Sequence, residues 1–298
     1  MPRRFIYLIN PISGTRQKDS LLKLVSEFTR KEGIPFEILP TVASGDYAFL
    51  EQKIEEEKIT DVIICGGDGT VNQVVYPLAR TRVRFGLIPM GSGNGLALAA
   101  RISKEPRQAL EIIFAGHAQL VDGFMVNEQF ACMLCGLGFD AMVAHEFAAY
   151  GKRGLATYAK LTTKNFFSAK PYQFGVEANK LQFSADAYFV SIANSNQFGN
   201  NFTIAPEAKL SDGLLDVVIV KKTLKPMLLL NVLQQVWGGK IQKIENSLNS
   251  PVIYFQTDAL KIHNRQMAPM HIDGDPKESL ADLDIKILPR YFNLIQPL

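Results

Sequence analysis

The stretch that decides the fold is Asp61-Val62-Ile63-Ile64-Cys65-Gly66-Gly67-Asp68-Gly69-Thr70, an apolar run that ends in a glycine turn. The apolar run predicts a buried strand, and the residues from about Val71 onward predict a helix. Glycines let a backbone approach a phosphate closely, and a helix N-terminus presents N–H groups and a favourable dipole to an anion. We therefore expect a nucleotide phosphate at this turn.

A second glycine loop follows the next predicted strand. Residues 83–89 lead into Met90-Gly91-Ser92-Gly93-Asn94-Gly95-Leu96. Leu96 stands where a dinucleotide fingerprint would have its third glycine, and the sequence contains no GxxxxGK[ST] P-loop. Each loop alone is compatible with a simple strand-to-helix turn, but the two together favour a different kind of phosphate cradle.

The first 122 residues alternate between strand and helix patterns. The expected elements are strands at 5–9, 36–39 and 62–65 and helices around 21–28 and 48–54. Such alternation predicts a parallel sheet with helices on both faces. Ligands of these sheets bind at the carboxyl ends of the strands. The loops that fall there begin at Asn10, Thr41, Gly66 and Gly91.

After Asp122 the pattern changes to short strands separated by turn residues. Asn127-Glu128-Gln129 between two apolar runs predicts a hairpin. We expect strands at 124–126, 130–134, 187–193, 214–220, 252–257 and 283–288 and helices at about 139–168 and 226–237. The sequence thus predicts an α/β domain at 1–122 and an antiparallel β-rich domain at 123–289, with the tail at 290–298 able to return to the first domain.

Composition limits the class of protein. The 298 residues are 47% hydrophobic, enough for one large core or two ordinary ones. A formal net charge of +3 argues against a nucleic-acid binder but allows a local basic patch that faces an anionic membrane. No apolar run approaches 18 residues, so no transmembrane helix is expected. The first apolar run is too short for a signal peptide, which indicates a cytoplasmic protein.

The three cysteines make no disulfide framework, in keeping with a reducing compartment. Cys132 and Cys135 form a lone CxxC motif. In a strand they would point to opposite faces and could not hold one metal, so we interpret both as core residues.

A basic segment punctuated by aromatic residues allows two interpretations. It comprises Lys152, Arg153, Tyr158, Lys160, Lys164, Phe166, Phe167 and Lys170. A solvated helix face explains it, and so does docking on an anionic lipid surface. The second interpretation would make the protein transiently membrane-associated.

Three acidic motifs supply candidates for a metal ligand and a base, which phosphoryl transfer requires. Asp68 lies inside the phosphate loop, where a carboxylate is explained by nearby Mg²⁺ or by an Asx-type turn. Asp212-Gly213 and Asp273-Gly274-Asp275 are turn signals as well as acidic sites. For each motif the structural and the functional interpretation remain open.

The ordered set of motifs resembles the lipid kinases that share the diacylglycerol kinase catalytic domain, among them sphingosine kinases and bacterial diacylglycerol kinases. The matching segments are Asn10-Pro11-Ile12-Ser13-Gly14, Gly66 to Thr70 with Asn72, Gly91-Ser92-Gly93-Asn94, Gly136-Leu137-Gly138-Phe139-Asp140-Ala141, Asp212-Gly213-Leu214-Leu215-Asp216 and Asp273-Gly274-Asp275. The resemblance implies a nucleotide-binding α/β domain followed by a β-sandwich that receives the lipid.

We expect ATP to bind at the strand ends of the first domain. The expected contacts are Asn10, Pro11, Ser13, Gly14, Thr41, Gly66, Gly67, Asp68, Gly69, Thr70, Asn72, Gly91 and Ser92. By the resemblance, Mg²⁺ is held by the Asp212 side chain and by the carbonyl groups of Lys209 and Leu214.

The resemblance also implies a catalytic base. The family pattern is Asp-Gly-Glu, in which the glutamate looks like the proton acceptor, so Asp275 takes that role here. Aspartate is one methylene shorter, and this leaves open whether Asp275 or Asp273 reaches the substrate hydroxyl.

The leading hypothesis is an ATP- and Mg²⁺-dependent kinase that phosphorylates a hydroxyl of a lipid such as diacylglycerol or a sphingoid base. An NAD kinase-like enzyme shares GGDGT and would use Asn127-Glu128 as its acidic pair, although these residues lie in a predicted hairpin turn. A catalytically inactive lipid- or nucleotide-binding regulator is a third hypothesis, because Asp275 replaces glutamate. The sequence leaves the oligomeric state open, with a homodimer among the options.

Overall fold

The structure is a computed structural model of the 298-residue chain. It describes residues 2–10, 18–150, 155–166, 168–179, 181–197, 204–222 and 251–298. The chain divides into two compact units. Unit 1 comprises Met1–Val121 and Arg290–Leu298, and unit 2 comprises Asp122–Pro289. The helix predicted at 226–237 lies outside the described residues.

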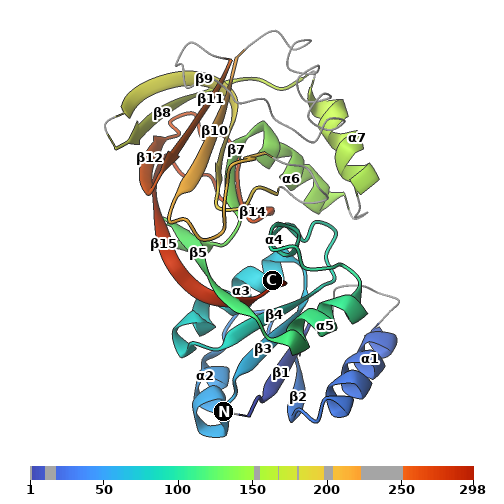
Figure 1. Cartoon of the computed structure of the whole chain (residues 1–298). Coiled ribbons are helices and arrows are strands. Elements are labelled where there is room, and N and C mark those ends of the chain that lie inside the picture. The colour runs from blue at the N-terminus through green and yellow to red at the C-terminus, as the bar shows by residue number, and fades with distance from the viewer. Residues whose placement is uncertain are drawn as a thin grey trace. The chain divides into compact units, whose positions relative to one another are not determined.

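Unit 1 is a parallel sheet with helices on both faces, as predicted. Its elements are β1 (Phe5–Ile9), α1 (Lys18–Lys31), β2 (Phe36–Pro40), α2 (Ala48–Glu57), β3 (Asp61–Gly66), α3 (Asp68–Leu78), η1 (Ala79–Thr81), β4 (Arg84–Pro89), α4 (Gly95–Ala99) and α5 (Pro106–Ala115). The strand order is β2-β1-β3-β4, and every pair is parallel. Figure 1 shows α2 and α3 on one face of this sheet and α1 and α5 on the other.

Burial on both faces explains the composition of the central strands. All five residues of β1 and all six of β3 are buried, which is typical of parallel strands covered on both sides. The helices are bounded by ordinary signals. Pro106 occupies the first position of α5, and Gly116 ends it with a φ of +71°.

The last residues of the chain complete the sheet of unit 1. The final strand, β15 (Asp282–Ile295), places Asn293 and Leu294 beside β4 in parallel. The Phe292 ring packs edge-on against Phe85 of β4, with 6.1 Å between the ring centroids. The C-terminal segment is therefore a structural part of unit 1.

Unit 2 is an antiparallel β-rich domain, also as predicted. Its elements are β5 (Ala118–Val126), which begins in unit 1, β6 (Gln129–Ala131), β7 (Leu134–Gly138), α6 (Phe139–Ala149), α7 (Leu155–Phe166), β8 (Tyr172–Ala178), β9 (Leu181–Ala193), β10 (Leu215–Lys221), β11 (Val252–Thr257), β12 (Ala259–His263), β13 (Met270–Ile272), β14 (Asp275–Lys277) and most of β15. Their main order is β14-β13-β7-β9-β8-β12-β15, while β10 joins β9 to β11 and β5 joins β15 to β6.

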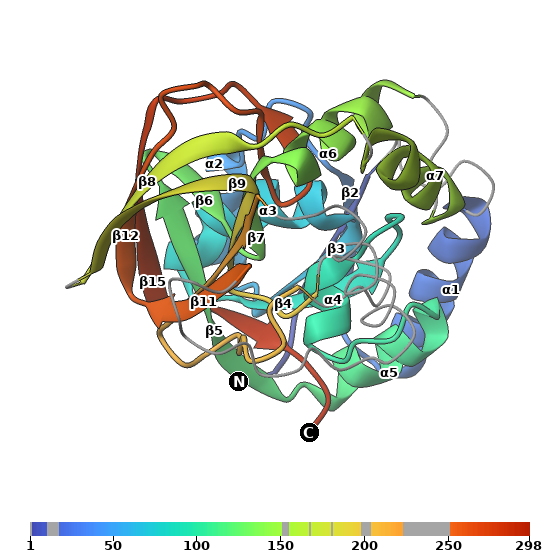
Figure 2. The same ribbon diagram turned by 90° about the horizontal axis from the view of Figure 1, so that it is seen from above.

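The core of unit 2 is built from the inward faces of its strands. Phe124, Phe174, Ile192 and Ile285 are among its fully buried members. The residues of β15 alternate between exposed and buried over its first half, the pattern of a strand with one solvated face. Figure 2 shows α6 and α7 side by side in this unit.

Two predicted elements of unit 2 differ from the structure. The run at 130–134 is not one strand, because β6 ends at Ala131 and β7 begins at Leu134. The break has a cause in the tertiary structure, since the Asp273 carboxylate accepts hydrogen bonds from the backbone N–H groups of Cys132 and Met133. The single helix expected at 139–168 is two helices, α6 and α7.

Among the residues that the structure describes, no helix is both long enough and apolar enough to cross a lipid bilayer.

Candidate functional site

The register of the parallel strands brings the predicted phosphate loops to one edge of the sheet. Ile9 pairs with Pro40 and Cys65, and Gly66 pairs with Pro89. The residues that follow these positions are therefore neighbours. From β1 the chain passes to β2 on one side and then to β3 on the other, so the strand order reverses between β1 and β3. Open α/β sheets bind their ligands at such a reversal.

The first glycine loop is the start of a helix. Gly67 is the N-cap of α3, and the Val71 N–H donates to the Gly67 carbonyl over 3.0 Å. The prediction that the helix begins near Val71 is therefore wrong, because Asp68, Gly69 and Thr70 already form its first turn. Helix geometry leaves the N–H groups of a first turn without an intrahelical acceptor, which suits an anion.

The two glycine loops pack directly against each other. A Cβ added to Gly91 would lie 2.7 Å from the Gly67 Cα, and one added to Gly67 would lie 3.1 Å from the Gly91 Cα. Two backbones approach this closely only where neither carries a side chain. These glycines are thus needed to bring the loops together, whatever else they contact.

Asp68 connects the two loops through its carboxylate. Its Oδ2 accepts from the Gly95 N–H over 3.1 Å, and its Oδ1 accepts from the Leu96 N–H over 3.4 Å. These N–H groups begin α4, so Asp68 caps that short helix. The structure thus gives Asp68 a long-range contact that joins the loops, which the sequence analysis did not foresee.

Asn94 shapes the second loop, and the sequence analysis did not select it as a site residue. It is buried, has a φ of 55°, and accepts the Gly91 N–H on Oδ1 over 2.8 Å. Its Nδ2 donates to the Gly91 carbonyl over 2.7 Å. The signal in the sequence was an asparagine among glycines, because asparagine tolerates the left-handed conformation better than most residues.

The end of β1 is tied to the first turn of α3. Asn10 Nδ2 donates to Thr70 Oγ1 over 2.9 Å, and the Asn10 N–H donates to the Cys65 carbonyl over 3.2 Å. The N–H of Thr41, which follows β2, donates to the carbonyl of Ile9 at the end of β1. Asn72 and Ser92 are both partly exposed at this edge. Pro11, Ser13 and Gly14 lie outside the described residues.

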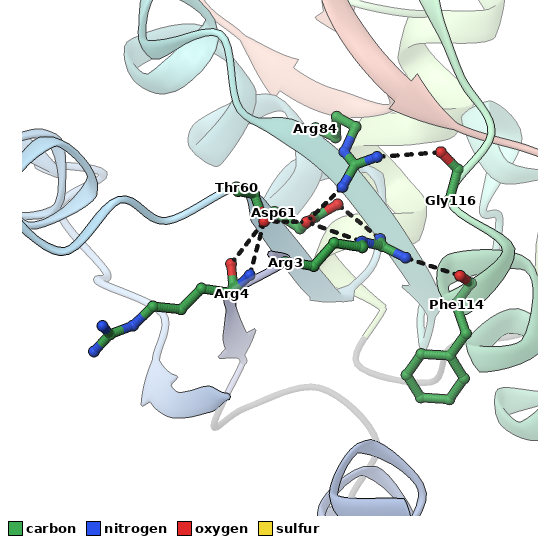
Figure 3. Close-up of polar contacts among 7 residues, drawn as sticks. All are labelled: Arg3, Arg4, Thr60, Asp61, Arg84, Phe114 and Gly116. Carbon is green, nitrogen blue, oxygen red and sulfur yellow. Dashed lines mark hydrogen bonds and ion pairs between the residues drawn. The ribbon is translucent and has the colours of Figure 1, made fainter. Parts of the chain in front are cut away.

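At the opposite edge of the sheet, two partly exposed arginines form an ion cluster around a buried aspartate (Figure 3). Asp61, at the start of β3, is fully buried and contacts Arg3 over 2.8 Å and Arg84 over 2.9 Å. The same arginines donate to the Phe114 and Gly116 carbonyl groups at the end of α5.

Two surface hollows of about 520 and 390 Å³ in unit 1 both include Arg82, just before β4. They do not include the glycine loops, which follow the strand ends.

The turn at Asp212-Gly213 in unit 2, the predicted metal site, is hydrogen-bonded to the buried Asp122. Asp212 is exposed, and its Oδ1 accepts the Leu214 N–H over 3.1 Å in an Asx turn. Beneath it, Asp122 is fully buried and accepts the Gly213 N–H on Oδ2 over 2.7 Å. Asp122 was not predicted as a site residue. The exposed Lys209 lies in the same turn.

Asp216, at the second residue of β10, lies in a different environment from Asp212. It is fully buried and accepts hydrogen bonds from the Tyr254 hydroxyl and from Gln256 Nε2. Burial raises the pKa of Asp216 to about 6, and the two donors oppose this rise. Burial also raises the pKa of Tyr254, and the neighbouring Asp216 adds to that shift.

The Asp273-Gly274-Asp275 segment is a two-residue hairpin between β13 and β14. Ile272 pairs with Asp275, and the two turn residues have φ values of 50° and 84°. Positive φ at both positions is the signature of a type I′ turn, for which Asp-Gly is a preferred pair. The motif is therefore a turn, and it presents Asp275 at the start of β14.

The fold places the two carboxylates of this motif in different surroundings. Asp273 is buried, and its Oδ1 accepts from the Met133 and Leu134 N–H groups over 2.9 and 3.0 Å. Its Oδ2 accepts from the Cys132 N–H over 3.0 Å. Asp275 is exposed to solvent.

The remaining predicted features lie in unit 2. Lys160 and Lys164 are exposed one turn apart on α7, and Lys170 is exposed beyond it. The structure does not describe Lys152, Arg153 and Phe167 or the side chains of Tyr158 and Phe166.

Asn127, in the β5–β6 hairpin, donates to the Asp282 carbonyl over 3.2 Å and accepts the Asp284 N–H over 2.7 Å. Cys132 and Cys135 are buried, and burial raises the pKa of the Cys135 thiol.

Solved structures with this architecture are known. A structure from Bacillus anthracis str. Sterne matches with a TM-score of 0.80 over 99% of this chain and 95% of that chain, at 20% identity. A second, described as a diacylglycerol kinase of the same strain, matches with a TM-score of 0.75 at 19% identity, over 99% of this chain and 97% of that one. At such identities the likeness establishes the fold.

Sequence relatives extend the comparison. A protein of Chromohalobacter salexigens named "Probable lipid kinase YegS-like" is 28% identical over 255 residues, which are 83% of this chain and 79% of the relative. A Staphylococcus aureus protein named "Diacylglycerol kinase" is 27% identical over 291 residues, which are 92% and 87% of the two chains.

Two family descriptions together cover most of the sequence. Residues 4–126 match the diacylglycerol kinase catalytic domain, and residues 134–296 match the YegS C-terminal NAD kinase beta sandwich-like domain. The chain therefore belongs to the family in which a diacylglycerol kinase catalytic domain is followed by a YegS-type C-terminal domain.

Proposed function

We propose that the protein is a kinase that transfers a phosphoryl group from ATP to a hydroxyl of a lipid, of the diacylglycerol or sphingoid type. The observation that carries the proposal is the packing of two glycine loops at the start of α3, where the strand order of a parallel sheet reverses. Membership of a family that includes a relative named "Diacylglycerol kinase" supports the choice of a lipid as acceptor.

The nucleotide is assigned to the carboxyl edge of the sheet in unit 1. The proposed contacts are Asn10, Pro11, Ser13, Gly14, Thr41, Gly66, Gly67, Asp68, Gly69, Thr70, Asn72, Gly91 and Ser92. Within this set the first turn of α3 offers N–H groups to a phosphate. Three side chains hold the loops together by hydrogen bonds within the site: Asp68 binds the Gly95 N–H, Asn94 binds the Gly91 N–H, and Thr70 binds the Asn10 side chain.

Mg²⁺ is assigned to the turn that carries Asp212. Within the described residues no three His, Cys, Asp or Glu side chains gather as a metal site, so protein carboxylates alone do not provide a cage. Magnesium commonly takes one or two carboxylates and completes its shell with water and substrate phosphates. The exposed Asp212 carboxylate with the carbonyl groups of Lys209 and Leu214 is an all-oxygen set of this kind. When bound, the ion would neutralise charge on the phosphates.

Asp275 is assigned as the base that accepts the proton of the attacking hydroxyl. A base needs an accessible oxygen within hydrogen-bond reach of its substrate. Asp275 is exposed, whereas three backbone N–H groups occupy both oxygens of Asp273. The contacts therefore favour Asp275 as the base and give Asp273 the structural role.

The lipid acceptor implies contact with a membrane surface. The exposed Lys160, Lys164 and Lys170 provide positive charge on and beside α7, which suits the anionic headgroups of a bilayer. We propose transient, peripheral attachment through this segment.

The deciding experiment incubates the full chain with labelled ATP and Mg²⁺ in detergent, with diacylglycerol, a sphingoid base or NAD as acceptor. Label in a lipid product is the expected result. Asp275→Asn should lower kcat by roughly 10²- to 10⁴-fold with little change in ATP affinity, while Asp275→Glu should retain activity.

The same experiment separates the alternatives. Label in NAD but not in lipid would replace the proposal by an NAD kinase-like activity. ATP binding without any labelled product would leave a regulator that binds nucleotide. Against the first alternative, the Asn127 side chain is already hydrogen-bonded to the backbone of β15.

A further inference from the structure

A buried chain of polar groups lies behind the hairpin that carries Asp275. His271, in β13, is fully buried, and Asp140, at the start of α6, is nearly so. His271 Nε2 lies 3.5 Å from Asp140 Oδ2. On the other side of the ring, the Gly274 N–H donates to His271 Nδ1 over 3.2 Å. These two contacts thus connect α6, through the imidazole of His271, to the tip of the hairpin.

These contacts define the state of the imidazole. Because Nδ1 accepts a hydrogen bond from a backbone N–H, it carries no proton, and the ring proton is therefore on Nε2, facing Asp140. Asp140 is itself held in place, because its Oδ1 accepts the Ala141 N–H over 2.8 Å. The carboxylate faces Nε2 at ion-pair distance, and Nδ1 accepts the hydrogen bond from Gly274.

A glycine leaves the space in which the two side chains meet. Gly136 of β7 pairs with His271 across the sheet. A Cβ added at Gly136 would collide with both Asp140 Oδ2 and His271 Nε2. Three elements, β7, α6 and β13, are therefore arranged around one imidazole–carboxylate contact.

The hairpin does not need this contact in order to form. A type I′ Asp-Gly turn is stable in its own geometry, and an apolar pair would pack β13 against α6 without burying ionisable groups. The hydrogen bond from the Gly274 N–H to His271 has a directional effect on the backbone that apolar packing would not have. It fixes the orientation of the peptide that joins Asp273 to Gly274, one residue before Asp275. Asp275 itself begins β14, a strand of only three residues at the edge of its sheet.

We propose that His271, oriented by Asp140, is a positioning residue that fixes the hairpin tip so that Asp275 is held in its reactive orientation. This inference rests on the proposed function, in which Asp275 is the base. Displacing a reacting group by about 1 Å costs up to about 10²-fold in rate, and losing a residue that orients such a group typically costs 10- to 100-fold.

The test compares three variants by kcat, by KM for ATP and by thermal stability. His271→Leu fills a similar volume with apolar atoms but removes the contacts to Asp140 and Gly274. It should lower kcat roughly 10- to 100-fold with KM for ATP unchanged. His271→Asn keeps an acceptor near the Nδ1 position, and it should recover most of the lost kcat. The matched control is His145→Leu, because His145 contacts the Met270 carbonyl of the same strand but not the hairpin tip. It should lower stability and leave kcat unchanged.

A double-mutant cycle separates positioning from a general effect on the fold. If His271 acts through Asp275, His271→Leu should change kcat less than about twofold in an Asp275→Asn background. An equal fold-loss in both backgrounds, or an unchanged kcat in folded His271→Leu, would overturn the inference while the proposed function stands. Where His271→Leu does not fold, Asp140→Asn takes its place in the same cycle. A wild-type chain that phosphorylates no lipid would instead overturn the proposed function itself.

Discussion

Two aspartates that lie two residues apart in the Asp-Gly-Asp hairpin have different surroundings. Asp273 replaces water for three backbone N–H groups of residues 132–134, whereas Asp275 faces solvent. Asp273→Asn should therefore destabilise the protein by about 1–3 kcal/mol, because the amide nitrogen would face backbone donors in a buried site. Urea unfolding measures this difference. An unchanged unfolding midpoint would show that Asp273 is not structural.

A second prediction at the residue scale concerns pH. His263 contacts Asp282 over 2.6 Å and Glu177 over 3.3 Å, and these partners raise the pKa of His263 above its ordinary 6.5. The same contact lowers the pKa of Asp282 below 3.8. The stabilisation is therefore complete between pH 3.8 and 6.5, and it is lost as pH rises through the folded-state pKa of His263.

The check is a comparison of melting temperatures. His263→Gln should melt below the wild type at pH 5.5, and the difference should shrink as the pH rises above 6.5 and through the folded-state pKa of His263. A difference that stays constant over this range would mean that packing, and not charge, is the contribution of His263.

Residue roles were predictable from sequence only where the signal is local. Asp212-Gly213 and Asp273-Gly274 were identified as turns because turn chemistry depends on adjacent residues. The partners of Asp273 lie about 140 residues earlier, and Asp68 caps a helix that begins 27 residues later. Asp122 and Asp216 were missed for the same reason, because their partners Gly213 and Tyr254 are far away in the sequence. Asn94 binds Gly91 only three residues away, so its signal was local and was overlooked.

At the scale of elements, the contact between the glycine loops leads to a further prediction. Gly91→Ala would place a Cβ 2.7 Å from the Gly67 Cα, which only a backbone shift can relieve. We expect a stability loss of about 1–3 kcal/mol and weaker ATP binding, because the shift displaces the start of α3. Isothermal titration with an ATP analogue and thermal melting measure the two effects.

Gly33→Ala is the matched control for that variant. Gly33 has a φ of +66° and open space around its Cα, so alanine there costs only backbone strain of about 1–2 kcal/mol. Its effect on ATP affinity should be nil. If both variants weakened binding equally, the loop contact would have no special part in forming the site.

Element types were predicted well because hydrophobic periodicity is a local property. The alternation at 1–122 indicated a parallel sheet, and all its predicted strands are present. The starts and ends of elements were less predictable. The start of α3 was placed at Val71 because glycine and aspartate are turn formers, yet an N-terminal turn accepts both. The strand at 130–134 is interrupted by a carboxylate from the other end of the chain.

At the scale of the whole molecule, the chain enters unit 2 by β5 and returns to unit 1 by β15. The sequence analysis allowed for this return at 290–298 but offered no pairing partner. Parallel pairing with β4 depends on a strand more than 200 residues away, and no local pattern specifies such a partner. The stability of the candidate nucleotide-binding unit thus depends on the last residues of the chain.

Phe292→Ala tests this dependence in the full chain. Phe292 is 1% exposed and packs on Phe85 of β4, so its truncation should cost about 3–5 kcal/mol. Since Phe292 belongs to unit 1, hydrogen exchange should accelerate in β1, β3 and β4 more than in β9 and β10 of unit 2. ATP should partly restore the lost stability, by about 2.7 kcal/mol at a hundredfold excess over its Kd, because it binds the folded form of that unit. Equal acceleration in both units would mean that they unfold together, and Phe292 would then stabilise the molecule as a whole.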